Sequence, residues 1–201
     1  MFNRFFKDIP DRRTSRYSRD IRSAALSTGR LHLGCGGNVM NDWTNIDLEP
    51  QPGAFGWNLT DALPLPASSI QYIFAEHFIE HISWAEGQKL LRECRRVLKP
   101  GGALRLSTPD LAFILKQYGV GRIDEWSDLS WLLETPCAMV NEGLRLWGHQ
   151  YVYDRHDLHR ALTMAGFAKV EDTGWRQGTV PELTGLEIRP WHHELIVEAW
   201  T

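Results

Sequence analysis

The sequence predicts an α/β domain built on a mostly parallel, doubly wound sheet with helices on both faces. Two observations lead to this fold class. Short apolar runs typical of buried strands alternate along the chain with segments of helical periodicity. Glycines and polar residues follow several of these runs directly, at the carboxyl ends of the predicted strands, where parallel sheets bind ligands. With 201 residues, 43% of them hydrophobic, the chain is long and apolar enough for one core.

The first half of the chain contains three predicted strands and one predicted helix. The strands are the apolar runs Arg30–Leu33, Trp43–Ile46 and Ile70–Ala75. The segment Ser83–Leu98 is predicted to be a helix, because Ser83 can cap it and its apolar residues recur at helical spacing. The proline-rich segment before the third strand, residues 63–66, is predicted to be a loop.

The second half continues the alternation. The sequence "KPGG" at residues 99–102 should end the helix, and a strand should follow at residues 103–107. Asp154 can cap a helix that Gly166 stops. We therefore predict helices at residues 111–118 and 155–165, and two closing strands at residues 168–172 and 194–199. Residues 120–150 are rich in tryptophan and show no clear pattern.

Composition excludes several classes of protein. The net charge of −3 argues against nonspecific binding to nucleic acid. The three cysteines are far apart, which favours a reducing cytoplasm over a disulfide framework. No apolar run is long enough to cross a bilayer, and the first residues lack the apolar core of a signal peptide. Residues 1–22 carry seven Lys/Arg against three Asp, so we expect residues 1–29 to form a basic N-terminal arm or lid before the domain at 30–201.

The segment "LHLGCGGNVMNDWTNID" raises the question of the ligand. A dinucleotide site needs a third glycine where Val39 stands, and an acid about 20 residues on, whereas Asp47 comes 13 residues after Gly34. S-adenosylmethionine needs a tight turn for its amino-acid end, a carboxylate for its ribose diol and a slot for adenine. Gly34, Cys35 and Gly36 could supply the turn and Asp47 the carboxylate. Asn58 and Leu59 could supply the adenine slot.

The blocks "LHLGCGG", "WTNIDLEP", "LPLPASSIQYIFAEHFIEHI" and "LLRECRRVLKPGGALRLSTPDL" occur in this order at compatible spacings. Together they resemble the class I S-adenosylmethionine-dependent methyltransferases, particularly the type-11 methyltransferase domains. "GHQYVYDRHDLHRALTMAGFAKVE" is similar to the closing region of that group. The resemblance covers residues 30–201. It implies a Rossmann-like seven-stranded sheet whose last strand is antiparallel.

The resemblance also implies roles for individual residues, with S-adenosylmethionine as the cofactor. It assigns Gly34, Cys35 and Gly36 to the methionine portion, Asp47 to the ribose, and Asn58 and Leu59 to adenine. Glu76 and His77 should lie beside the sulfonium.

Two positions depart from the family pattern. His32 stands where an acid usually helps to hold the cofactor's amino group, and could replace it through a neutral ring nitrogen. Asn58 replaces an aspartate, and its carbonyl oxygen can still accept from the adenine amino group.

Methyl transfer needs alignment, and a hydroxyl acceptor also benefits from a general base. His77, after the third predicted strand, and His149, in an aromatic cluster with Tyr151 and Tyr153, are the candidate catalytic groups. The alternative for both is pocket shaping or core packing. His77 and His81 are four residues apart but lack an evident third ligand, so we expect no metal site.

The leading hypothesis is therefore a methyltransferase acting on a small-molecule acceptor, with a sugar or glycolipid hydroxyl as first guess. A non-catalytic binding module on the same fold is the alternative, motivated by His32. A nicotinamide-dependent oxidoreductase is disfavoured by Val39 and the early Asp47, and a nucleic-acid methyltransferase by the lack of a strong basic face. A homodimer through Trp126, Trp131 and Trp147 is a further possibility; the same residues could instead roof the pocket.

Overall fold

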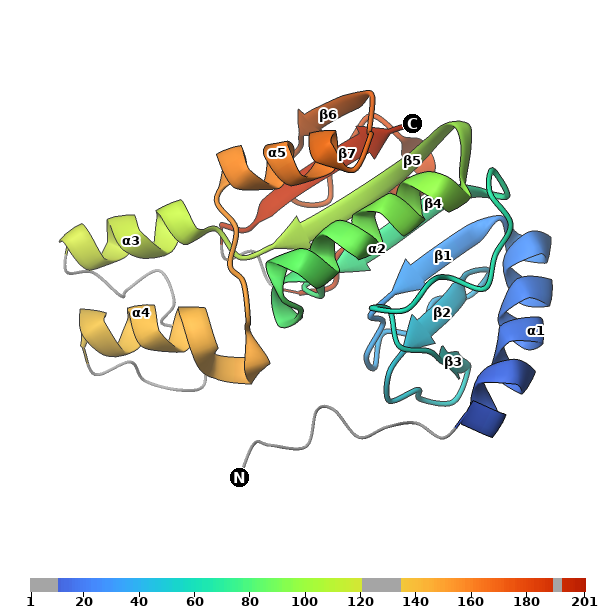
Figure 1. Cartoon of the computed structure of the whole chain (residues 1–201). Helices are drawn as coiled ribbons and strands as arrows, with labels where there is room; N and C mark the ends of the chain where they lie inside the picture. The colour runs from blue at the N-terminus through green and yellow to red at the C-terminus, as the bar shows by residue number, and fades with distance from the viewer. Residues whose placement is uncertain (1–10, 121–134, 190–192) are drawn as a thin grey trace.

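The computed structural model describes residues 11–120, 135–189 and 193–201, and for residues 11–16 the backbone alone. In these ranges a seven-stranded sheet has the strand order β3-β2-β1-β4-β5-β7-β6 (Figure 1). Its strands are β1 (Arg30–Leu33), β2 (Thr44–Asp47), β3 (Ala54–Gly56), β4 (Ile70–Glu76), β5 (Leu98–Thr108), β6 (Lys169–Asp172) and β7 (Leu195–Trp200).

The sheet is parallel except at β7, which runs antiparallel to both β5 and β6. The predicted fold class, a Rossmann-like sheet with one antiparallel strand at the end of the chain, is confirmed. The helical elements are α1 (Asp11–Thr28), η1 (Ile79–His81), α2 (Trp84–Val97), α3 (Leu111–Val120), α4 (Pro136–Arg145), η3 (Leu146–Gly148), α5 (Arg155–Met164) and η4 (Pro181–Leu183).

The predicted helix after Ser83 is stabilised at its start by a capping box. The Ser83 hydroxyl accepts from the backbone N–H of Glu86, and the Glu86 carboxylate accepts from the backbone N–H of Ser83. The predicted break "KPGG" is a bulge inside the strand ladder. Leu98 already pairs with Ile70, and pairing resumes regularly where Ala103 meets Tyr72.

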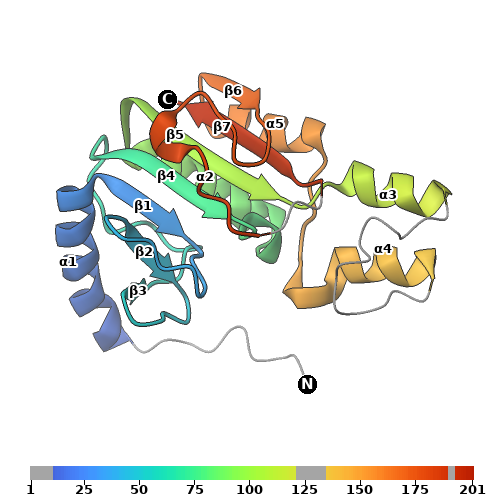
Figure 2. The same cartoon turned by 180° about the vertical axis from the view of Figure 1, so that it is seen from behind.

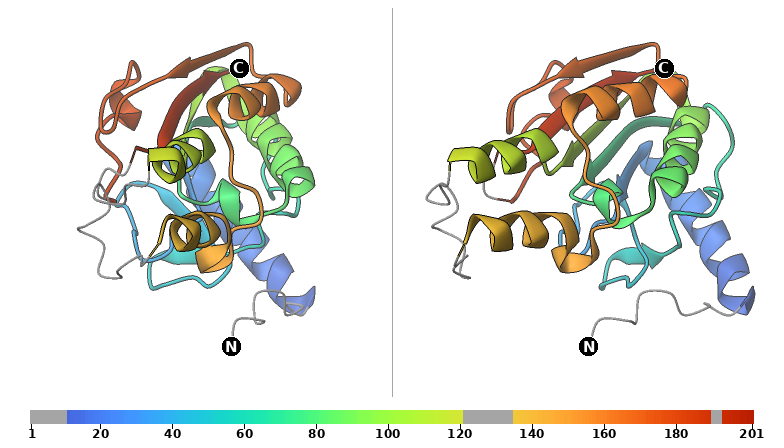
Figure 3. Two further views of the ribbon diagram at one scale, coloured as in Figure 1. Left: turned by 90° about the vertical axis from the view of Figure 1, so that its left-hand side faces the viewer. Right: turned by 60° about the vertical axis from the view of Figure 1, so that its left-hand side comes forward.

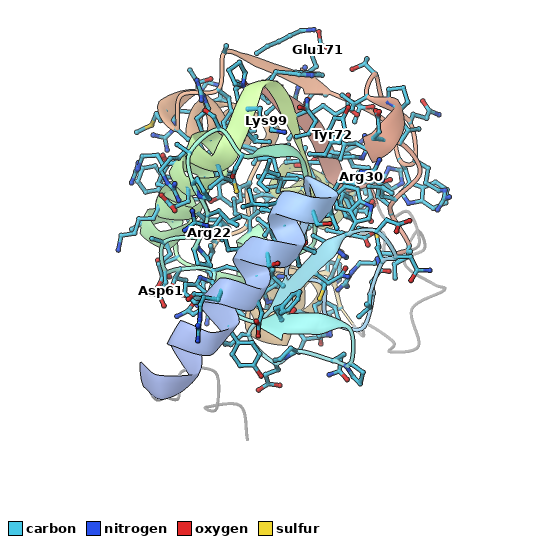
Figure 4. The ribbon with its side chains drawn as sticks, turned by 90° about the vertical axis from the view of Figure 1, so that its right-hand side faces the viewer. Arg22, Arg30, Asp61, Tyr72, Lys99 and Glu171 are labelled. Atoms are coloured by element: carbon cyan, nitrogen blue, oxygen red, sulfur yellow. The ribbon has the colours of Figure 1, made fainter. Side chains whose placement is uncertain are left out.

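The basic segment near the N-terminus is part of the fold from Asp11 onward. Helix α1 packs on β2 and β3 (Figure 4). Its Ile21 and Ala25 are fully buried in the main core. The part of the expected arm that precedes Asp11 lies outside the described residues, as do Trp126 and Trp131.

The two faces of the sheet are covered differently. Residues of α1, α2 and α5 share the larger core cluster, against strand residues such as Leu31 and Leu104 (Figure 2). On the opposite face, Trp43 and Phe74 pack with Leu183 of η4. The pair α3 and α4 extends beyond the sheet, past the carboxyl ends of β4 and β5 (Figure 3).

Candidate functional site

The carboxyl ends of β1, β2, β4 and β5 bring most of the predicted site residues to one edge of the sheet. Leu33 pairs with Ile46, so the glycine turn begins beside the end of β2. Glu76 pairs with Ser107, so the residues after β4 begin beside the end of β5. The edge therefore joins segments from residues 34–37, 47–49, 76–81 and 107–110.

The glycine turn is held by backbone hydrogen bonds and is open on one side. The N–H groups of Gly34 and Cys35 both donate to the carbonyl of Ile46, at 2.9 and 3.2 Å. Gly34 has φ +64° and Gly36 has φ +51°, a region that side chains disfavour. A Cβ added at Gly36 or Gly37 would meet nothing within 4 Å. The backbone there can accept close approach of a ligand.

Asp47, the last residue of β2, is hydrogen-bonded to this turn. Its Oδ2 accepts from the Gly36 N–H at 2.8 Å, and its Oδ1 accepts from the Glu49 N–H at 3.0 Å. Each carboxylate oxygen has a second lone pair, and the side chain is only half-buried. The carboxylate can therefore accept further hydrogen bonds from two adjacent hydroxyls.

Cys35 lies inside the same turn with its side chain buried. Burial raises the pKa of its thiol to about 11. The thiol therefore stays protonated at neutral pH and is not a nucleophile, although its backbone remains part of the turn.

His32 is a buried residue of β1, close to the start of the glycine turn. Its ring is buried, lies 5.1 Å from the ring of Phe74, and its Nδ1 is 3.2 Å from Oδ1 of Asn45. Burial lowers the pKa of His32 to about 4, despite the hydrogen bond with Asn45. The ring is neutral and holds the segment between β1 and β2, which fits a supporting role better than direct contact with a cofactor.

Asn58 and Leu59, which were predicted to contact adenine, make other contacts in the structure. Oδ1 of Asn58 already accepts from the backbone N–H and the hydroxyl of Thr60, at 3.0 and 2.8 Å. This oxygen is therefore poorly placed to accept from adenine, contrary to the expectation. The side chain of Leu59 is buried in the main core, so only its backbone could line an adenine slot.

The carboxylate of Glu76 also has hydrogen-bond partners. It accepts from the backbone N–H groups of Ile188 and Arg189, both at 3.1 Å to Oε1. The side chain thus anchors the loop before β7. These contacts do not support the expectation that it faces the sulfonium.

His77 follows β4 directly, at φ +50°, and lies between two buried carboxylates. Its Nδ1 is 3.3 Å from Oε1 of Glu80, and its Nε2 is 3.4 Å from Oε1 of Glu194. Burial alone would lower the pKa of His77, but Glu194 and Glu80 outweigh it and raise the pKa to about 9. The ring is therefore an imidazolium at neutral pH with both nitrogens engaged. It cannot serve there as the general base that the sequence suggested.

His149, the other candidate catalytic residue, lies beside His81. Their ring centroids are 4.9 Å apart in an edge-to-face arrangement. Nδ1 of His149 is 2.9 Å from the carbonyl oxygen of Gly143. A carbonyl only accepts, so Nδ1 carries the proton and Nε2 carries a lone pair. His149 can therefore act as a base, whereas Tyr151 and Tyr153 pack edge-to-face, Tyr153 fully buried.

Two residues of this edge were missed by sequence reasoning. The ring of Phe78 packs so tightly on Gly34 that a Cβ at Gly34 would come within 2.3 Å of it. Ser107 has a buried hydroxyl with no hydrogen-bond partner among the described residues. Nothing in the local pattern distinguishes Phe78 from a core residue. Ser107 could have been found from its place at the end of a predicted strand.

Comparison with known proteins identifies the domain. Residues 31–106 match the family model described as a methyltransferase domain. This segment is a methyltransferase domain. It contains the glycine turn, Asp47 and His77, and the predicted family is confirmed. A search of curated proteins found no significant match.

Solved structures resemble the whole fold around this methyltransferase domain. A methyltransferase from Archaeoglobus fulgidus, described as SAM-dependent, is 14% identical over 94% of each chain, with a TM-score of 0.51. A possible histamine N-methyltransferase from Thermotoga maritima is 15% identical over 94% of this chain and 96% of its own, with a TM-score of 0.53. An S-adenosylmethionine-dependent methyltransferase from Mesorhizobium loti is 16% identical over 86% of this chain and 90% of its own, with a TM-score of 0.51. At this identity the likeness supports the class I methyltransferase fold.

Within the described ranges, none of the helices has the length and apolar character needed to cross a bilayer.

Proposed function

We propose that this protein transfers a methyl group from S-adenosylmethionine to a small-molecule acceptor. The main support for the proposal is the open glycine turn, in which the Gly36 N–H donates a hydrogen bond to the Asp47 carboxylate. Both lie inside the segment that matches a methyltransferase domain. The turn allows close approach to the backbone at Gly36 and Gly37, which the amino-acid end of the cofactor needs. Asp47 offers a bidentate acceptor for the ribose diol.

The cofactor supplies an activated methyl group on its sulfonium, so the protein mainly binds and aligns. Gly34, Cys35 and Gly36 would hold the methionine portion through their backbone, and Asp47 the ribose. The orphaned hydroxyl of Ser107 is a buried polar group that a ligand at this edge could satisfy. His77 would keep the end of β4 in place through its two carboxylate partners.

For the acceptor we propose a hydroxyl group, with a sugar or glycolipid as its source. His149 supports this choice, because its Nε2 lone pair can take the hydroxyl proton. Trp147, whose ring centroid is 5.8 Å from that of His149, is 51% exposed and could stack on a sugar ring. The cytoplasmic location and the homodimer remain predictions.

The alternative is a binding module on the same fold that performs no transfer. One observation favours it: the His77 ring, the nearest imidazole to the end of β4 along the chain, is engaged by two carboxylates and is not a free base. Under this alternative the cofactor binds and is not consumed.

The test is release of S-adenosylhomocysteine when the protein is incubated with S-adenosylmethionine and a panel of sugars, glycolipid headgroups and small amines. We expect release with a hydroxyl acceptor, and expect His149→Ala to reduce it far more than the exposed control His156→Ala. Cofactor binding without release over the whole panel would favour the binding module. Release with amines alone would overturn the hydroxyl assignment.

A further inference from the structure

Three side chains with metal-ligating atoms meet beside the proposed methyl-transfer site. One ligand atom each of Glu80, His81 and His149 lies within 4.8 Å of the other two. Two imidazoles and one carboxylate form a donor set typical of zinc and related divalent transition metals. Residue His149 is 68 positions from His81, so the set could not be recognised from local spacing.

The imidazole rings of His81 and His149 pack edge-to-face, with their centroids 4.9 Å apart. Nδ1–H of His149 donates to the carbonyl of Gly143, so Nε2 of His149 carries a lone pair. Metal-binding histidines usually have this arrangement, since the outer hydrogen bond fixes the tautomer and the ring orientation.

The carboxylate of Glu80 is fully buried and retains lone pairs for a further ligand. Its Oε2 accepts from the hydroxyl of Thr108 at 3.1 Å. Its Oε1 makes an ion pair with His77, whose Nδ1 is 3.3 Å away, but no hydrogen bond of good geometry. Each carboxylate oxygen has two lone pairs, so one on each remains available to a metal ion.

The backbone holds the two halves of the cluster together. The N–H groups of Gln150 and Tyr151 both donate to the carbonyl of Glu80, at 2.7 and 3.2 Å. The side-chain amide of Gln150 donates to the carbonyl of His81 at 2.9 Å. These three hydrogen bonds fix the chain that carries His149 against the chain that carries Glu80 and His81.

We propose that Glu80, His81 and His149 bind a divalent transition-metal ion, with zinc as the expected metal. Zinc takes histidine nitrogens and carboxylate oxygens at about 2.0–2.2 Å, and three protein ligands leave a fourth position for water or an acceptor oxygen. The ligand atoms need to draw closer than in the structure, and the half-buried imidazoles can do so by small ring movements. The sequence alone predicted no metal site, because the pair His77 and His81 lacks an evident third ligand; the proposed site instead combines His81 with Glu80 and His149. It goes beyond the proposed methyl transfer but uses the same Nε2 lone pair of His149, so in the zinc-loaded protein His149 is a ligand and not the general base.

The test is titration of the full-length, metal-free protein with ZnCl2 in competition with a chromophoric chelator, without S-adenosylmethionine. We expect one zinc per chain. We expect His149→Ala and His81→Ala each to weaken zinc binding more than about 100-fold. Loss of a hydrogen bond to a metal ligand alone lowers metal affinity about 10–100-fold, and these variants remove the ligand itself. The matched control, His156→Ala, removes an exposed histidine and should bind as the wild type does.

Two further measurements separate ligation from general damage to the fold. Thr108→Val keeps the shape of the side chain but removes the hydrogen bond to Glu80, and should weaken zinc about 10-fold. Co²⁺ in place of zinc should give visible absorption bands of a four- or five-coordinate site, which His149→Ala abolishes. Equal zinc affinity in wild type, His81→Ala and His149→Ala, or no binding by folded wild type, would overturn the proposal. Neither result would bear on methyl transfer, because no cofactor is present.

Discussion

Replacement of Gly34 by alanine should destabilise the fold through two separable effects. At φ +64° any residue with a Cβ is strained, which costs about 1–2 kcal/mol. The new Cβ would also lie 2.3 Å from Cδ2 of Phe78, and such overpacking costs about 1–3 kcal/mol. We expect a loss of about 3 kcal/mol in the free energy of unfolding, measured by urea denaturation.

The matched control is Gly37→Ala, three residues along the same turn. Gly37 lacks a positive φ, and a Cβ there meets nothing within 4 Å, so its stability should change by less than about 0.5 kcal/mol. Adding Phe78→Ala to Gly34→Ala should recover the steric part, giving a coupling of about 1–2 kcal/mol in a double-mutant cycle. A Gly34→Ala loss below about 1 kcal/mol, or zero coupling to Phe78, would refute the reasoning.

Three other outcomes are expected. Asp47→Ala should weaken binding of S-adenosylmethionine about 10-fold or more in calorimetry, because it removes a charged bidentate acceptor, whereas exposed Asp61→Ala should not. His77→Ala should cost about 3 kcal/mol of stability in urea, because it removes the cation that lies between two buried carboxylates; the exposed pair of His159 should contribute under about 1 kcal/mol, and equal losses would contradict this account. Burial lowers the pKa of His32 in the folded protein to about 4, below the unfolded value of about 6.5, so its contribution to stability is complete above pH 6.5 and is lost as pH falls towards 4. That loss amounts to about 3 kcal/mol, and His32→Gln should flatten the pH dependence of stability over this window.

Much of the fold could be predicted because its elements are encoded locally. The run Arg30–Leu33 is a strand with the predicted bounds, and Ser83 caps the predicted helix. Strand β3 was missed because it has three half-buried residues and no clear alternation. The basic N-terminal segment is typical of a solvated arm or helix, and its packing on the sheet could not be predicted, because many arginines surround the few apolar residues, such as Ile21 and Ala25, that enter the core.

The candidate site could be predicted only in part. The glycine turn and Asp47 are 11 to 13 residues apart, on adjacent strands, so their proximity follows from the strand pattern. The partners of Glu76 are Ile188 and Arg189, and one of the two partners of His77 is Glu194, all more than a hundred positions away. No local pattern indicates such contacts. They change the chemistry of His77, from a free base to a paired imidazolium.

The central claim is that the edge formed by the glycine turn and Asp47 binds S-adenosylmethionine. Calorimetric titration of the purified protein with S-adenosylmethionine, S-adenosylhomocysteine and NADH tests it most directly. We predict that the first two bind and that NADH does not, with both affinities reduced in Asp47→Ala. Binding of NADH alone, or S-adenosylmethionine binding that Asp47→Ala leaves unchanged, would contradict the account.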